Sequence, residues 1–193
     1  MNITVYCGAA EGMDPEYIAR AKELGAWMAR EGHTLIYGAG NAGMMGAVSD
    51  ALIEGGGEAI GVTPRFFILA EETRNDLSEV IVSDDMSTRR NWMIENGDAF
   101  IALPGGMGTL DEITEVMTYK RLGLLGEINK PVMIYNVNGY YDRFFEYLGD
   151  MLEQGFCRQL DCDNVIEVRS IGDIAAALES AGSVDETRTS KYD

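Results

Sequence analysis

Short apolar runs alternate along the chain with longer stretches in which apolar residues recur every three or four positions. The short runs are typical of buried strands, and the longer stretches are typical of amphipathic helices. The runs predict strands at residues 3–7, 34–37, 59–63, 80–82, 98–103, 131–135 and 165–168. The stretches predict helices at residues 15–30, 44–53, 88–95, 109–122, 140–154 and 171–178. Asp14 and Pro15 are typical of a helix start, and they support the first of these helices.

This order of elements predicts an α/β protein, because a strand, a helix and a second parallel strand form a right-handed unit whose helix covers the sheet. We expect a Rossmann-like three-layer sandwich, in which a central parallel sheet is flanked by helices. Residues 1–182 are predicted to form a single domain, followed by a polar, disordered tail at 183–193. Residues 64–77 are predicted to be irregular, with Phe66 and Phe67 exposed. Ligands of such sheets bind beyond the carboxyl ends of the strands.

The acidic composition narrows the choice of partners. The 193-residue chain has a formal net charge of −17 at pH 7, which argues against nucleic acid and membrane surfaces as partners. No apolar run approaches the ~20 residues of a membrane span. The start of the chain, MNITVYCGAA, lacks the basic segment of a signal peptide and is expected to be a strand.

Cysteine and histidine usage argues against disulfides and metal sites. Cys7, Cys157 and Cys162 form no Cys-x-x-Cys pair, which favours reduced thiols in a cytoplasmic protein. The single histidine, His33, precedes an apolar run and is expected to pack rather than to bind a metal. We therefore expect no metal.

The segment PGGMGTLDE, residues 104–112, follows the strand best suited to a central position and opens a helix. Its glycines let the backbone approach a ligand closely, and the free N–H groups at a helix start bind anions. A phosphate bound there needs no basic side chain, which suits so acidic a chain. Thr109 and Glu112 alternatively fit a capping box, which would explain those two residues but not the three glycines.

A second glycine-rich turn, GAGNAG at residues 38–43, matches G-x-G-x-x-G between a strand and a helix. Dinucleotide binding is disfavoured, because the next strand ends at Thr63-Pro64 without an acid to hold a ribose. We expect instead a second wall of a mononucleotide pocket, lined by Met44 and Met45.

Arg89 and Arg90 lie early in a predicted helix, where a cation opposes the helix dipole. Two interpretations stay open for them: a solvated helix face and a ligand-binding role.

At these residues the sequence resembles the LOG family, the cytokinin riboside 5′-monophosphate phosphoribohydrolases, which are often labelled lysine decarboxylases. The family signature is PGGxGTxxE preceded by a helix with an Arg-Lys pair, and this chain has PGGMGTLDE with Arg89-Arg90 upstream. The resemblance extends to about Gly155 and includes YGAGNAGMMGAVSDAL, GVTPRFF and YNVNGYYD. It implies a nucleotide-binding domain that cleaves the N-glycosidic bond of a nucleoside 5′-monophosphate. It also implies a homodimer with pockets near the subunit interface and no metal or organic cofactor.

The resemblance further implies roles for individual residues. Arg89 and Glu112 match the family's catalytic pair. Glu112 would stabilise the positive charge that builds on the sugar, while Arg89 would hold the phosphate or ribose and assist the departing base. The expected substrate-binding positions are Gly43, Met44, Glu71, Arg90, Gly105, Gly106, Met107, Gly108, Thr109, Leu110, Asp111 and Thr118.

Three differences from the family leave the released base open. Ser87-Thr88 stands where the family often has His-Glu, and Arg90 stands where lysine is usual. The turn YGAG, residues 37–40, lacks a third glycine that is common in the family. Cytokinin precursors, AMP and other nucleotides are all compatible with this pattern. A non-catalytic nucleotide or molybdenum-cofactor carrier of the same superfamily is the alternative, and a dinucleotide oxidoreductase is less favoured.

A pyridoxal-phosphate decarboxylase is disfavoured because such enzymes need a lysine that forms a Schiff base with the cofactor. The lysines of the chain are Lys22, Lys120, Lys130 and Lys191. None of them is predicted at a strand end beside a glycine-rich turn.

Overall fold

The computed structural model describes residues 1–69, 73–74, 76–126 and 130–182. The strands in this part of the chain are β1 (Asn2–Tyr6), β2 (Thr34–Tyr37), β3 (Ala59–Pro64), β4 (Glu79–Ser83), β5 (Ala99–Ala102), β6 (Val132–Tyr135) and β7 (Val165–Val168). The helices are α1 (Pro15–Arg30), α2 (Gly43–Glu54), α3 (Arg65–Leu69), α4 (Met86–Asn96), α5 (Met107–Leu122), α6 (Asp142–Glu153), α7 (Gln159–Asp163) and α8 (Ile171–Gly182), with a 3-10 turn η1 (Val137–Gly139). Each predicted strand and helix has its counterpart here.

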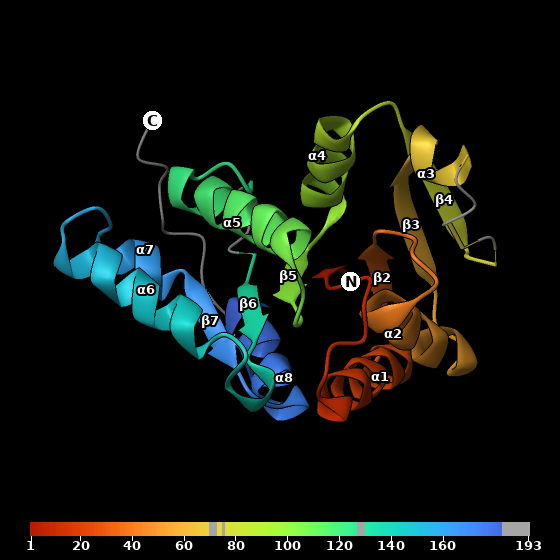
Figure 1. Ribbon diagram of the computed structural model, residues 1–193, viewed down its shortest axis with the longest axis horizontal. Coiled ribbons are helices and arrows are strands. Elements are labelled where there is room, and N and C mark those ends of the chain that lie inside the picture. Colours follow the sequence, from red (N-terminus) through yellow and green to blue (C-terminus); the bar gives the residue numbers. More distant parts are fainter. Residues whose placement is uncertain (70–72, 75, 127–129, 183–193) are drawn as a thin grey trace.

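The strands form one sheet in the order β4-β3-β2-β1-β5-β6-β7, and every pairing between the described strands is parallel (Figure 1). The chain winds outward from β1 to β4 and then returns to place β5 on the other side of β1. At the carboxyl ends of these two strands, Tyr6 pairs with Ala102. The winding direction reverses between β1 and β5, and sheets of this kind bind ligands in the crevice at that point.

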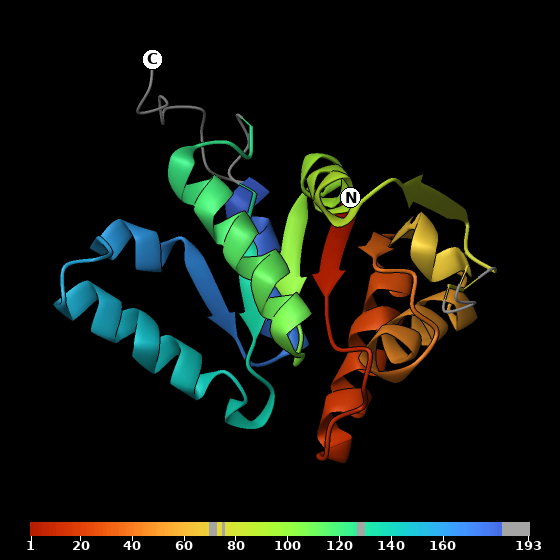
Figure 2. The ribbon, with the colours of Figure 1, turned by 45° about the horizontal axis from the view of Figure 1, so that its top comes forward.

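Alternate strand residues face two helical layers. Ile3 and Val5 of β1 pack in one core with residues of α1, α2 and α8, whereas Tyr6 packs in a second core with α4, α5 and α6. Figures 1 and 2 show these helices on the two faces of the sheet. Every residue of β5 is buried, as a parallel strand covered on both faces requires. The predicted Rossmann-like three-layer α/β fold is confirmed.

Some local predictions are wrong. The segment predicted to be irregular begins with the short helix α3, although Phe66 and Phe67 are exposed as expected. The helix predicted from residue 140 starts at Asp142, because η1 with Asn138 at φ 49° occupies the preceding turn. Helix α7 lies where no element was predicted, since so short a helix shows no apolar period. The predicted tail 183–193 lies outside the described residues.

Candidate active site

Three loops meet at the carboxyl edge of the sheet, where the winding direction reverses. The N–H of Gly8, after β1, donates to the carbonyl oxygen of Pro104, after β5, at 3.1 Å. The N–H groups of Met44 and Met45, at the start of α2, donate to the carbonyl oxygens of Ala10 and Gly8, each at 3.3 Å. The loops after β1, β2 and β5 therefore form one continuous surface.

Helix α5 begins on this surface without a side-chain cap. Its N-cap residue is Gly106 in an extended conformation, and no side chain of the described residues bonds to the cap. Gly106, Met107 and Gly108 are exposed. The first N–H groups of a helix have no partner within it. Together with the helix dipole they make the start of α5 a candidate anion site, at the position that the sequence predicted.

The capping-box alternative is wrong. Thr109 is the third residue of α5 rather than its N-cap, because the helix starts earlier than predicted. Its buried side chain packs so closely beside Gly105 that a Cβ atom at Gly105 would lie 2.1 Å from Thr109 Oγ1. Glu112 bonds to a partner on another helix instead of returning to the cap.

That partner is Arg89 of α4. Arg89 Nη1 forms an ion pair with Glu112 Oε1, and the two side chains are only 7% and 11% exposed. Arg89 Nε donates to the carbonyl oxygen of Val62 at 2.8 Å. On the remaining side the guanidinium contacts the glycine-rich turn, where a Cβ atom at Gly38 would lie 2.6 Å from Arg89 Nη2. The interpretation of Arg89 as part of a solvated helix face is therefore wrong.

Burial shifts the pKa values of Glu112 and of the neighbouring Tyr6. Burial raises the pKa of the Glu112 carboxyl, and the nearby guanidinium of Arg89 opposes that rise. Burial also raises the pKa of the Tyr6 hydroxyl, with a further contribution from the charge of Glu112. The site thus holds a carboxylate whose charge is poorly solvated and depends on its arginine partner.

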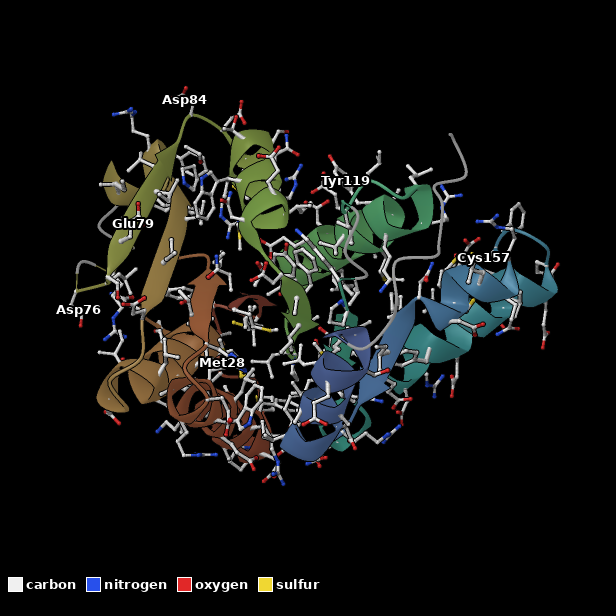
Figure 3. All side chains as sticks on the ribbon, turned by 180° about the vertical axis from the view of Figure 1, so that it is seen from behind. Met28, Asp76, Glu79, Asp84, Tyr119 and Cys157 are labelled. Carbon is white, nitrogen blue, oxygen red and sulfur yellow. The ribbon has the colours of Figure 1, made fainter. Side chains whose placement is uncertain are left out.

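A second ion pair lies beside the first. Arg90 Nε bonds to Glu115 Oε2 at 2.7 Å, and Arg90 Nη1 lies 3.3 Å from Asp111 Oδ2. Tyr119, labelled in Figure 3, donates its hydroxyl to Asn91 Oδ1 at 3.3 Å. These contacts join α4 to α5, the two helices that carry Arg89 and Glu112. The sequence patterns did not single out Glu115, although its spacing of three from Glu112 places it on a neighbouring part of the helix surface.

Other predicted substrate-binding residues lie on α2 and α5. Gly43 starts α2 against the carbonyl group of Ala9. The prediction that the Met44 side chain lines a pocket is wrong, because this side chain is 1% exposed and belongs to the core. Met45 contacts the glycine-rich turn. Leu110 packs partly into the core that contains α4 and α5.

Thr118 is exposed on α5, two helical turns beyond Asp111, which is also exposed. Glu71 lies outside the described residues.

Two tyrosines bond to the segment that precedes α5, and no role was predicted for either. Tyr140 donates its hydroxyl to the carbonyl oxygen of Gly105 at 2.6 Å, and Tyr141 donates its own to that of Leu103 at 2.8 Å. Both belong to the segment YNVNGYYD, which carries the family resemblance. Their spacing from the glycine loop in the sequence gave no signal that they would meet it.

A separate hollow of about 870 Å³ lies beside the turn at residues 38–43. Its lining consists of Asn41, Asp50, Ile68, Thr73, Arg74, Asp76 and Val80. The charge of Arg74 is already paired with Asp50 and Asp76. Neither Arg89 nor Glu112 lines this hollow, so we locate the candidate chemistry at the start of α5 instead.

In the described part of the chain, no group of three or more His, Cys, Asp or Glu residues is arranged to hold a metal ion. The same residues include no helix long and apolar enough to cross a membrane.

The parallel sheet with helices on both faces defines a Rossmann-like α/β protein, with its candidate anion site at the carboxyl edge of the sheet. Among solved structures, the Moco carrier protein from Chlamydomonas reinhardtii has a TM-score of 0.69 at 22% identity, covering 94% of this chain and 97% of that one. The molybdenum cofactor binding protein from Rippkaea orientalis has the same TM-score of 0.69 at 24% identity, over 94% and 97% of the two chains. At these identities the likeness concerns the fold alone.

Sequence relatives are more specific. Residues 45–178 match the family model described as "Possible lysine decarboxylase". The "Cytokinin riboside 5′-monophosphate phosphoribohydrolase LOG" of Oryza sativa subsp. japonica is 42% identical over 154 residues, which are 80% of this chain and 62% of that protein. The phosphoribohydrolase of Rhodococcoides fascians is 38% identical over 180 residues, 93% and 89% of the two chains. This chain belongs to the LOG family.

The positions of the lysines do not suit the decarboxylase description. Lys22 lies on α1 and Lys120 on α5, and Lys130 precedes β6. None of the three lies on a glycine-rich loop, where a Schiff-base lysine would be needed. Lys191 lies outside the described residues.

Proposed function

We propose that this protein hydrolyses the N-glycosidic bond of a nucleoside 5′-monophosphate, releasing the free base and ribose 5-phosphate. A cytokinin riboside 5′-monophosphate or an AMP-like nucleotide is the substrate class. The observation that carries the proposal is the buried pair of Arg89 and Glu112 beside the uncapped start of α5. The relatives named phosphoribohydrolases support the same reaction.

In the proposed mechanism the 5′-phosphate binds the N–H groups of residues 106–109, which need no basic side chain to hold it. As the bond between C1′ and the base nitrogen breaks, positive charge builds on the ribose. The Glu112 carboxylate stabilises that charge and orients the water molecule that adds to C1′. The base leaves with the bonding electron pair and takes up a proton, while Arg89 holds the carboxylate in place and assists the departing base.

The remaining substrate contacts are proposed around this centre. Gly105 and Leu110 flank the phosphate loop, and Gly43 and the backbone of Met44 belong to the adjoining wall. Arg90, Asp111 and Thr118 lie on α4 and α5. We assign these three residues to the part of the pocket nearest a second subunit, and we propose Glu71 as a further substrate-binding residue.

We further propose a homodimer with its pockets near the interface, and a cytoplasmic location. The exposed positions of Asp111 and Thr118 on α5 support a shared pocket. The three cysteines are free thiols, which supports a reducing compartment.

The proposal is tested by incubating AMP and isopentenyladenosine monophosphate with the protein and separating free base and ribose 5-phosphate by chromatography. Glu112→Gln keeps an oxygen that can accept a hydrogen bond from Arg89, so we expect the fold to persist. We expect kcat to fall by roughly 10²- to 10³-fold, the usual loss when one group that stabilises a transition-state charge is removed.

Glu95→Gln, a carboxylate removed from the exposed face of α4, is the matched control and should retain activity. Full activity of Glu112→Gln would overturn the role of Glu112. Binding of both nucleotides by the wild type without base release would favour a carrier.

A further inference from the structure

The carbonyl groups of three consecutive residues before α5 are each held from a different part of the chain. Tyr141 donates to the carbonyl oxygen of Leu103 at 2.8 Å, and Tyr140 donates to that of Gly105 at 2.6 Å. Between them, the Gly8 N–H donates to the carbonyl oxygen of Pro104 at 3.1 Å. A loop that binds an anion must direct its N–H groups at the ligand and its carbonyl groups elsewhere. Each of these three hydrogen bonds draws a carbonyl group toward the protein.

The two tyrosines are themselves firmly anchored. The Tyr140 ring packs edge-on against Tyr17 of α1 and against Tyr141, with centroid distances of 5.5 Å and 4.9 Å. The Tyr141 N–H donates to Asn136 Oδ1 at 2.7 Å, and Asn138 Nδ2 donates to Asp14 Oδ2 at 2.9 Å. This segment is therefore braced against β6 and α1 and can serve as a support for the loop.

We propose that Tyr140 is a positioning residue for the 5′-phosphate of the substrate. Its hydroxyl holds the Gly105 carbonyl group away from the phosphate, so that the N–H groups at the start of α5 face the ligand. This inference rests on the proposed function, since it assumes that the loop binds the phosphate. Tyr140 does not touch the bond that breaks, and its effect is on binding.

Tyr140 is also the more informative tyrosine to change. Tyr141 is 2% exposed, so removing its hydroxyl would leave the buried carbonyl group of Leu103 without this hydrogen bond and would weaken the fold. Tyr140 is 43% exposed, and Gly105 is partly exposed. In Tyr140→Phe, water can therefore reach the Gly105 carbonyl group, and the melting temperature should stay within about 2 °C of the wild type.

The experiment is a calorimetric titration of ribose 5-phosphate, which has no N-glycosidic bond to be cleaved, into the wild type and Tyr140→Phe. We expect the variant to bind about fivefold to tenfold more weakly, the size of one lost hydrogen bond. In steady-state assays KM for AMP should rise by a similar factor, while kcat stays within about twofold because the loss is one of binding. Tyr147→Phe is the control and should match the wild type, because Tyr147 lies on α6 and is 60% exposed.

The outcomes separate this inference from the proposed function. If the wild type binds ribose 5-phosphate and Tyr140→Phe binds it equally well, the positioning role is wrong and the proposed function stands. If the wild type does not bind ribose 5-phosphate at all, the phosphate loop itself is wrong and both fall. A variant that lowers kcat with KM unchanged would also contradict a role in positioning the phosphate.

Discussion

Arg89 and Glu112 are separated by 23 positions in the sequence, yet their side chains meet in a buried ion pair. Burying such a pair removes two charges from water, a cost that is offset only when both partners are present and well hydrogen-bonded. Arg89 has such support, because Val62 accepts a hydrogen bond from its Nε. In the proposed reaction this pair places a carboxylate near the sugar with little competing water, where it can stabilise developing positive charge strongly.

The pH dependence of the reaction should report on this pair. In the proposed mechanism Glu112 acts as a carboxylate, and burial raises the pKa of this group while Arg89 opposes the rise. A carboxyl group with a raised pKa takes up its proton at a higher pH when the solution is acidified. We therefore expect kcat to decline on the acid side with a midpoint above the ordinary value for glutamate.

The measurement is kcat at saturating substrate from neutral to acidic pH, because the phosphate of the free substrate takes up a proton near pH 6 and perturbs kcat/KM. An acid limb at or below the ordinary glutamate value would contradict the role of a desolvated Glu112. Acid unfolding is checked by circular dichroism over the same range.

Among the elements, the helix whose N-cap was identified in the sequence was predicted with its correct bounds. Asp14 accepts a hydrogen bond from the Glu16 N–H at 2.9 Å, and α1 has the predicted bounds. The start of α5 was misplaced because Thr109 looks like a cap, whereas Gly106 takes that position and Thr109 is buried beside Gly105. Whether a threonine caps a helix or fills a space depends on what packs against it.

The contact between α1 and α2 depends on one glycine. A Cβ atom at Gly25 would lie 2.1 Å from the carbonyl oxygen of Val48, so Gly25→Ala must push the two helices apart. We expect a loss of about 2–3 kcal/mol in the free energy of unfolding, measured by urea denaturation. Gly149→Ala on α6 is the control, because a Cβ atom there meets nothing within 4 Å and alanine favours a helix. Equal stabilities of the two variants would show that the helices separate at little cost.

The whole molecule is strongly acidic, although its proposed substrate is an anion. The net charge of −17 produces a long-range field that repels phosphate, while helix N–H groups and Arg89 act only at close range. The acidic surface therefore slows the encounter, and the site recovers affinity after contact.

This balance predicts an unusual response to salt. Raising the ionic strength from about 10 mM to about 100 mM shortens the screening length from ~30 Å to ~10 Å and should weaken the repulsion more than the buried contacts. We expect kcat/KM for AMP to rise by roughly twofold to fivefold across that range. Adenosine, which lacks the phosphate, is the control and should show no such rise. A fall for AMP would mean that local positive charge dominates the approach.

Most elements, their order and the parallel α/β sheet could be predicted from the sequence. The signals that predict them are the spacing of apolar residues, the glycines and the helix caps, and these depend on residues that are close together in the chain. The family resemblance added Arg89 and Glu112 as a pair. Three features depended on the folded chain: the burial of that pair, the bond between Arg90 and Glu115, and the hold of Tyr140 on Gly105. Each joins residues from different elements, and such residues meet only once the order of strands and the packing of helices have placed them side by side.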